Sequence, residues 1–250
     1  MEFINQERLP AAVQKSIIIY GKELVKLLED NILSIVVCGD VLEAGFVPGK
    51  TNINLILILR QIDVTVMRRC LRLVSQGQGK RIVAPLMLTL QHIETSLDTF
   101  PLEFSAIKDN HLTIYGKDLL NDLKIEKSDL RLQCEREIKG KLIHLRQGYL
   151  ESVLKGNSLK TLLEISLFAI LPILRGALRL CCTDAPPAEN SAVIKMLSEK
   201  MPLDAELFMA VLRLREQKKS PPQTELETLL ANYLIQLQKL AHLIDQMEVQ

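Results

Sequence analysis

Residues 38–59 read CGDVLEAGFVPGKTNINLILIL, and this stretch decides the fold of the N-terminal half of the chain. The β-branched apolar run 33–38 leads into it and predicts a buried strand. Residues 39–50 are rich in glycine and turn-forming residues, so they predict a loop. Residues 52–59 return to an apolar run and predict a second strand, which begins with two asparagines.

Further elements alternate around these two strands. Apolar residues at helical spacing predict a helix on each side of the strand pair, and shorter apolar runs predict additional strands. This alternation favours an α/β (α+β) domain in which helices cover a mixed sheet. The expected helices are 11–29, 63–75 and 90–96, and the expected further strands are 82–88, 102–107 and the edge strand 111–115.

From about Asp129 onward strand-like alternation ends and long helical patterns take over. Gly156-Asn157 is a helix stop signal, Ser158 is a candidate N-cap, and Thr224 with Glu227 has the spacing of a capping box. Helices joined by short connections predict a bundle. We therefore expect an α/β domain over residues 1–125 and an all-α helical bundle over residues 126–250.

Composition and charge fit a globular protein of the cytoplasm. Apolar residues make up 48% of the chain, and the formal net charge is +1, so no global field attracts nucleic acid or a membrane. Residues 1–14 carry charges early and lack the apolar core of a secretory signal. The most hydrophobic stretch, 165–174, is shorter than the roughly 20 residues of a bilayer span.

Five cysteines without CxxC spacing predict reduced core residues.

Taken together, Cys38-Gly39-Asp40 and the following Asn52-Ile53-Asn54 resemble the nucleotidyltransferase superfamily. In that family a strand ends in Gly-Ser, and the next strand opens with an Asp-x-Asp pair. Residues at i and i+2 of a strand share one face, so two carboxylates converge there and hold Mg²⁺, which binds the triphosphate. The resemblance implies nucleotide-binding positions at Gly39, Asp40, Asn52 and Asn54.

At three of these positions the chain departs from the family pattern. Asp40 stands where the family has serine, and a carboxylate repels phosphate. Asn52 and Asn54 replace the two metal-binding aspartates, and an amide oxygen brings no negative charge. The resemblance therefore implies a degenerate site with no metal ligands and no expected cofactor.

Two later segments extend the resemblance. Glu103 falls on a predicted strand where the family has a third acidic residue, so the resemblance implies a general base there; an outward-facing strand glutamate is the alternative. Residues 112–118, LTIYGKD, resemble a segment of bacterial proteins related to antibiotic adenylyltransferases. Those proteins join a small α/β domain to a C-terminal helical bundle.

Three functions remain open at this point. The first is a catalytically degenerate protein that serves as a binding or interaction module for a protein, a nucleotide or another small molecule. The second is an active nucleotidyltransferase that uses Mg²⁺, a nucleoside triphosphate and Glu103, with further ligands from Glu43 or Asp63. The third is a structural or oligomerising protein, because the last helix is rich in leucine.

We expect no membrane partner. Arginine and lysine residues form a modest basic cluster, for which a solvated helix face is the favoured interpretation and nucleic-acid contact the less favoured one. The cluster consists of Arg68, Arg69, Arg72, Lys80 and Arg81.

Overall fold

The computed structural model describes residues 2–43, 45–155, 158–182, 185–217 and 219–248. The chain divides into two compact units. The first comprises Met1–Leu97 and Glu103–Lys124, and the second comprises Asp98–Leu102 and Ile125–Gln250.

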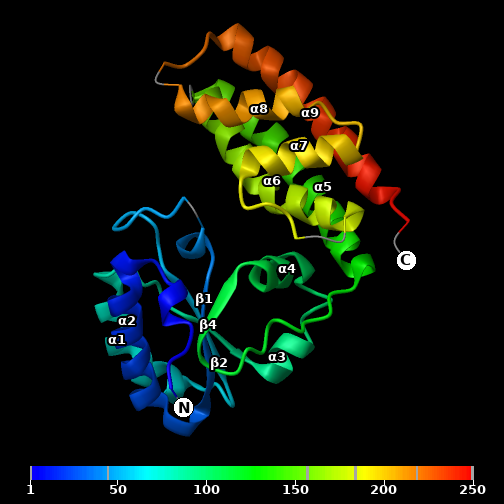
Figure 1. Cartoon of the computed structure of the whole chain (residues 1–250). Helices are drawn as coiled ribbons and strands as arrows, with labels where there is room; N and C mark the ends of the chain where they lie inside the picture. Colours follow the sequence, from blue (N-terminus) through cyan, green and yellow to red (C-terminus); the bar gives the residue numbers. More distant parts are fainter. Residues whose placement is uncertain (1, 44, 156–157, 183–184, 218, 249–250) are drawn as a thin grey trace. The chain divides into compact units, whose positions relative to one another are not determined.

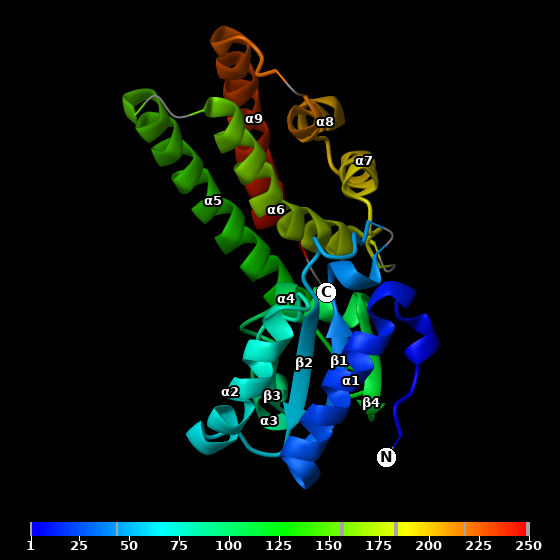
Figure 2. The ribbon, with the colours of Figure 1, turned by 90° about the vertical axis from the view of Figure 1, so that its left-hand side faces the viewer.

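A four-stranded sheet forms the centre of the first unit, in the order β3-β2-β1-β4 (Figure 2). β1 pairs antiparallel with both β2 and β4, and β2 pairs in parallel with β3. The predicted mixed sheet is therefore confirmed, and β4 is an edge strand as expected. The strands are β1 Ile32–Cys38, β2 Asn54–Leu59, β3 Leu86–Thr89 and β4 His111–Gly116.

Helices cover both faces of this sheet (Figure 1). α1 (Ala11–Leu28) and α2 (Val64–Gln78) pack on one face, where their apolar residues join alternate residues of the strands in one buried cluster. α3 (Leu90–Glu94) and α4 (Pro101–Asp109) lie on the other face. Asp63 caps α2, because its side chain accepts a hydrogen bond from the Val66 amide.

Three short 3₁₀ helices complete this unit: η1 Gln6–Arg8, η2 Glu29–Asn31 and η3 Asp40–Leu42.

Two predicted strands differ from the structure. Residues 102–107 belong to the helix α4, so the predicted strand is wrong. Pro101 is the first residue of α4, where a missing N–H costs nothing, and the alternation Leu-Glu-Phe is too short to separate strand from helix. β3 begins only at Leu86, because Pro85 cannot donate to the ladder; Ile82 forms an isolated bridge with Ile53.

In its described residues, the second unit is built from helices. α5 packs against α6 and α9, and α6 also contacts α7 and α8. Ser158 caps α6 as predicted, since its hydroxyl accepts from the Thr161 amide. The predicted stop at Gly156-Asn157 lies outside the described residues. The elements are α5 Lys127–Lys155, α6 Leu159–Cys181, α7 Asn190–Lys200, α8 Ala205–Arg213, η4 Leu214–Glu216 and α9 Gln223–Asp245.

The leucines of the last helix belong to the core of this unit. Leu226, Leu230, Leu237 and Leu240 are buried, and the other leucines of α9 pack against the same core cluster. Core burial therefore accounts for the leucine-rich pattern. The predicted capping box is wrong, because the N-cap position is Pro222.

α6 has the length and hydropathy of a membrane span, which the apolar stretch 165–174 alone does not show. Within the α6 window, 56% of the residues are buried by the rest of the protein. Burial of this kind is found in a central helix of a water-soluble bundle.

We predict that Gly116→Ala destabilises the protein by about 2–4 kcal/mol. Gly116 has φ +78°, and a Cβ there would overlap the backbone carbonyl oxygen of Leu33 on β1. The control is Gly79→Ala, because Gly79 has φ −63° and its added Cβ would lie 3.9 Å from the nearest atom. Urea unfolding followed by circular dichroism measures both; equal stabilities for the two variants would contradict the prediction.

Candidate functional site

One end of the sheet brings the motif positions together. Because β1 runs antiparallel to β2 and β4, the end of β1 meets the beginnings of both neighbours. Cys38 pairs with Asn54 on one side and with His111 on the other. Directly paired residues point to the same face, so these three side chains form a row across the sheet.

Gly39 makes the turn that follows this row. Its φ of +77° lies in the region that favours glycine, and η3 begins at the next residue, Asp40. A Cβ on Gly39 would lie 3.2 Å from Nδ2 of Asn54, so the Asn54 side chain packs against the turn. The structure therefore brings Gly39 and Asn54 together, as the motif spacing predicts, and places Asp40 exposed beside them.

Asn52 lies just before β2, outside the regular strand. It flanks Ile53 together with Asn54, and Ile53 is buried in the cluster under α1 and α2. Since alternate residues of an extended segment point to opposite sides, Asn52 and Asn54 lie on the side away from that cluster. Both side chains are exposed.

Asn110, between α4 and β4, forms hydrogen bonds to the loop that follows β1. Its amide Nδ2 donates to the carboxylate of Glu43 at 3.1 Å and to the Gly39 carbonyl at 3.4 Å. The backbone carbonyl of Asn110 accepts a hydrogen bond from the backbone amide of Gly39 at 3.4 Å. Glu43 therefore has an amide partner within the protein.

Glu103 does not occupy the position predicted for a third acidic residue. It lies in the first turn of α4 with an exposed side chain, and a carboxylate there favours the helix through its dipole. The strand beside β2 is β3, whose sequence Leu-Met-Leu-Thr contains no acidic residue. The prediction that Glu103 lies on a strand is therefore wrong.

The side chains at this end of the sheet are amides together with two carboxylates, those of Asp40 and Glu43. Across the described part of the chain, no group of three or more His, Cys, Asp or Glu side chains could hold a metal ion. Asn52, Asn54 and Asn110 present amides, which both donate and accept hydrogen bonds.

Cys38, at the centre of the row, carries a partly buried thiol. Burial raises the pKa of its thiol to about 11, so the thiolate is scarce at neutral pH. Its Sγ donates weakly to the Asn54 carbonyl at 3.9 Å. Of the five free cysteines, Cys70 and Cys134 are buried and the other three are partly buried.

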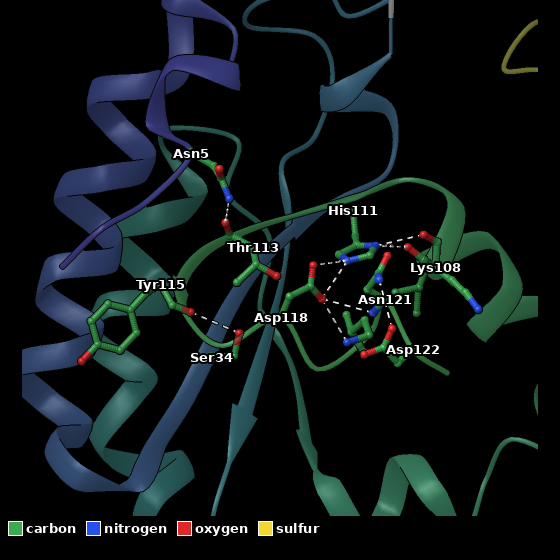
Figure 3. A network of polar contacts seen from close by, with 11 residues as sticks. Asn5, Ser34, Lys108, His111, Thr113, Tyr115, Asp118, Asn121 and Asp122 are labelled. Carbon is green, nitrogen blue, oxygen red and sulfur yellow. Dashed lines mark hydrogen bonds and ion pairs between the residues drawn. The ribbon is translucent and has the colours of Figure 1, made fainter. Parts of the chain in front are cut away.

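A second polar network lies at the other end of the row, where His111 meets Asp118 (Figure 3). Nδ1 of His111 lies 3.0 Å from the carbonyl oxygens of Ile107 and Lys108, and Nε2 lies 3.1 Å from the Asp118 carboxylate. Both ring nitrogens of His111 therefore face hydrogen-bond acceptors. The side chain of His111 is only 7% exposed, so this ion pair fixes the start of β4.

Asp118 also organises the turn that follows β4. Its Oδ1 accepts from the amides of Leu120 at 3.1 Å and Asn121 at 3.2 Å. Burial alone would raise the pKa of Asp118, but the hydrogen bonds from Leu120, His111 and Asn121 outweigh it and lower the pKa. The aspartate of the Tyr-Gly-x-Asp segment is therefore a structural acceptor.

Sequence reasoning missed Asn110 and His111. Both residues lie at the start of a predicted strand, and strand ends that share a sheet edge lie close together. The sequence alone, however, does not say which strands pair, so it could not place these two residues beside the motif.

The basic cluster is exposed, but two of its members make structural hydrogen bonds. The Arg69 guanidinium donates to the Leu27 carbonyl, and Nε of Arg81 donates to the Gly49 carbonyl at 3.1 Å. These two bonds hold the arginine side chains on the surface of the first unit.

No protein-family model matches the chain, and no curated protein matches it. Among the solved structures that match is a nucleotidyltransferase-like protein from Exiguobacterium sibiricum 255-15. The alignment covers 92% of this chain and 74% of that chain, with 14% sequence identity and a TM-score of 0.39.

We predict that Asp118→Ala lowers the free energy of unfolding by about 1 kcal/mol at pH 7, the usual effect of losing such a side-chain acceptor. The pKa of Asp118 is lowered from 3.8, so its stabilisation is present above that pH and is lost as the pH falls through the folded-state value. The difference between variant and wild type should therefore shrink toward pH 3.

Chemical denaturation at a series of pH values measures this difference. The control is Asp122→Ala, since Asp122 accepts only from the neighbouring Asn121 side chain among the hydrogen bonds resolved here. A difference that stays constant from pH 7 to below pH 3 would rule out the carboxylate as its cause.

Proposed function

We propose that this chain is a nucleotidyltransferase-fold protein, related to antibiotic adenylyltransferases, that has lost catalysis and acts as a binding or interaction module. The observation that carries the proposal is the packing of Asn54 against the Gly39 turn at the end of β1. This is the place where the family's motif brings a metal carboxylate to the phosphate-binding turn. The geometry of the motif is retained and its charge is absent.

Electrostatics supports the loss of catalysis. Mg²⁺ is a hard cation that dehydrates reluctantly, and it is held in proteins by one or two carboxylates together with substrate phosphates. Asn52 and Asn54 supply no charge, β3 supplies no acid, and Glu43 is hydrogen-bonded to Asn110. The exposed Asp40 beside the Gly39 turn would in addition repel a triphosphate.

The proposal leaves a role for this end of the sheet. Asn52 and Asn54 expose their amides beside the Gly39 turn, and these donors and acceptors suit an uncharged polar ligand. The helical second unit then serves as an interaction domain. We place the protein in the cytoplasm and propose no metal or nucleotide cofactor for it.

We predict that isothermal titration of the wild-type protein with ATP detects no magnesium-dependent binding in the micromolar range. In the double variant Asn52→Asp, Asn54→Asp, we expect affinity for Mg²⁺ with ATP to rise by about tenfold or more, because two carboxylates then converge beside the Gly39 turn. Addition of a chelator should abolish the gained binding.

The matched control is Asn52→Ala, Asn54→Ala, which removes the amides without adding charge and should gain no affinity. Magnesium-dependent micromolar binding by the wild-type protein would sink the proposal. Incubation with labelled nucleoside triphosphates and hydroxylated acceptors tests the alternative directly, and turnover by wild type would establish an active transferase.

A further inference from the structure

α1 and α2 lie side by side on one face of the sheet, and a groove runs between them (Figure 2). Tyr20 of α1 packs against Gly77 of α2, and the side chain of Arg69 reaches the carbonyl of Leu27. The earlier residue of α1 thus meets the later residue of α2, so the two helices run antiparallel. The groove has a volume of about 410 Å³, which is in the range of small-molecule sites.

Cations outnumber anions in this groove. Three positive charges less one negative charge leave a formal charge of +2 among its lining side chains. The charged residues are Lys26, Arg69, Arg72 and Glu23. Leu27 and Leu73 add apolar surface, and Gln76 adds an amide. The groove therefore combines concentrated positive charge with a partly apolar wall.

The three cations of the groove have no carboxylate partners. Within the parts of the chain that the structure describes, no ion pair joins any of them to an acidic side chain. In the helical unit, by contrast, Arg131 and Lys139 both pair with Glu135. Unpaired like charges that are held close together raise the local positive potential, which attracts an anion.

Arg69 is held in place before any ligand binds. Its guanidinium donates to the Leu27 carbonyl in the last turn of α1. A guanidinium has five N–H donors, so this bond leaves most of them available. Arg72 lies about one turn further along α2, and its side chain makes no hydrogen bond with the described residues. An arginine fixed in advance lowers the entropic cost of binding.

We propose that this groove binds a phosphate monoester group through Arg69, Arg72 and Lys26. Near neutral pH a phosphate monoester carries close to two negative charges, which match the formal charge of the groove. The planar forks of two arginines suit phosphate oxygens, and a lysine adds a compact point charge. The group belongs either to a small soluble molecule or to a lipid headgroup, because the chemistry that is recognised is the same.

The other lining residues fit the remainder of such a ligand. Leu27 and Leu73 can contact its carbon skeleton, and the amide of Gln76 can bond a hydroxyl group. Glu23 is the one lining residue that repels an anion, so its removal is an informative variant.

The lining also favours a small phosphate ester over nucleic acid. Proteins bind single-stranded nucleic acid along a basic groove in which bases stack on aromatic side chains. The residues that line this groove include no aromatic side chain.

This site is independent of the proposed function, since the lining includes neither the Gly39 turn nor the asparagines. Binding in the groove needs no Mg²⁺, so it should persist with a chelator and in the double variant Asn52→Asp, Asn54→Asp. The failure of one proposal therefore leaves the other standing.

Isothermal titration with glycerol 3-phosphate tests the site, at low ionic strength, in a phosphate-free buffer that contains a chelator. For wild type we expect a dissociation constant on the order of 0.1 mM. Arg72→Gln should weaken binding by about tenfold, because a charged donor to the phosphate is lost. Arg72→Lys should recover part of this loss, since it restores the charge without the fork.

Arg68→Gln is the matched control. Arg68 is an exposed arginine of the same helix that does not line the groove, so its loss should change the affinity by less than about twofold. Glu23→Gln should strengthen binding by about threefold, because it removes the carboxylate that opposes the phosphate. Circular dichroism checks that each variant is folded.

Vesicles distinguish the two sources of the phosphate group. Co-sedimentation compares vesicles of phosphatidylcholine alone with vesicles that also contain phosphatidic acid. Binding to phosphatidic acid that depends on Arg72 and is tighter than binding of glycerol 3-phosphate would assign the lipid headgroup. Tighter binding of glycerol 3-phosphate would assign the soluble ester.

Three results overturn the proposal. The first is wild-type protein that binds neither probe up to about 10 mM phosphate ester. The second is an equal loss of affinity in Arg68→Gln and Arg72→Gln, which would indicate a general effect of surface charge. The third is Arg72-dependent binding of a single-stranded oligonucleotide without binding of glycerol 3-phosphate, which would assign the groove to nucleic acid.

Discussion

The antiparallel pairing of β1 with both of its neighbours is the constraint on which the candidate site depends. It places the end of β1 beside the beginnings of β2 and β4, so residues far apart in the sequence share one row. Gly39 and Asn54 meet there, and Asn110 joins Gly39 to Glu43. The ion pair between His111 and Asp118 then fixes the other side of that row.

The backbone geometry at this end of the sheet does not depend on the side chains that would bind a metal ion. Backbone pairing and turn conformation depend on hydrogen bonds and on the φ of Gly39, neither of which needs a charged side chain. A magnesium site depends instead on carboxylates that converge within a few ångströms. Under the proposed function, amides in place of two carboxylates leave the sheet end intact and change only what it can bind.

In the helical unit, α5 and α9 both carry many apolar residues, but the two helices differ in how many of these residues are buried. α9 is rich in leucine, and its leucines are buried or pack against the core. α5 has fewer apolar residues on its inner face, yet Leu132, Ile143, Leu150 and Leu154 remain exposed on the opposite one. The leucines of α9 are therefore explained by the core that they build.

The sequence by itself determined the local elements: α1, α2, β1, β2 and the turn at Gly39, because their periodicity and glycine content act over a few neighbouring residues. It failed at Glu103, since a three-residue alternation fits a strand and a helix equally well and Pro101 decided between them. Only the tertiary structure decided which strand ends meet, that Asn110 and His111 belong beside the motif, and which face of α5 stays exposed. These properties depend on strand order and on burial by distant segments, which no local pattern contains.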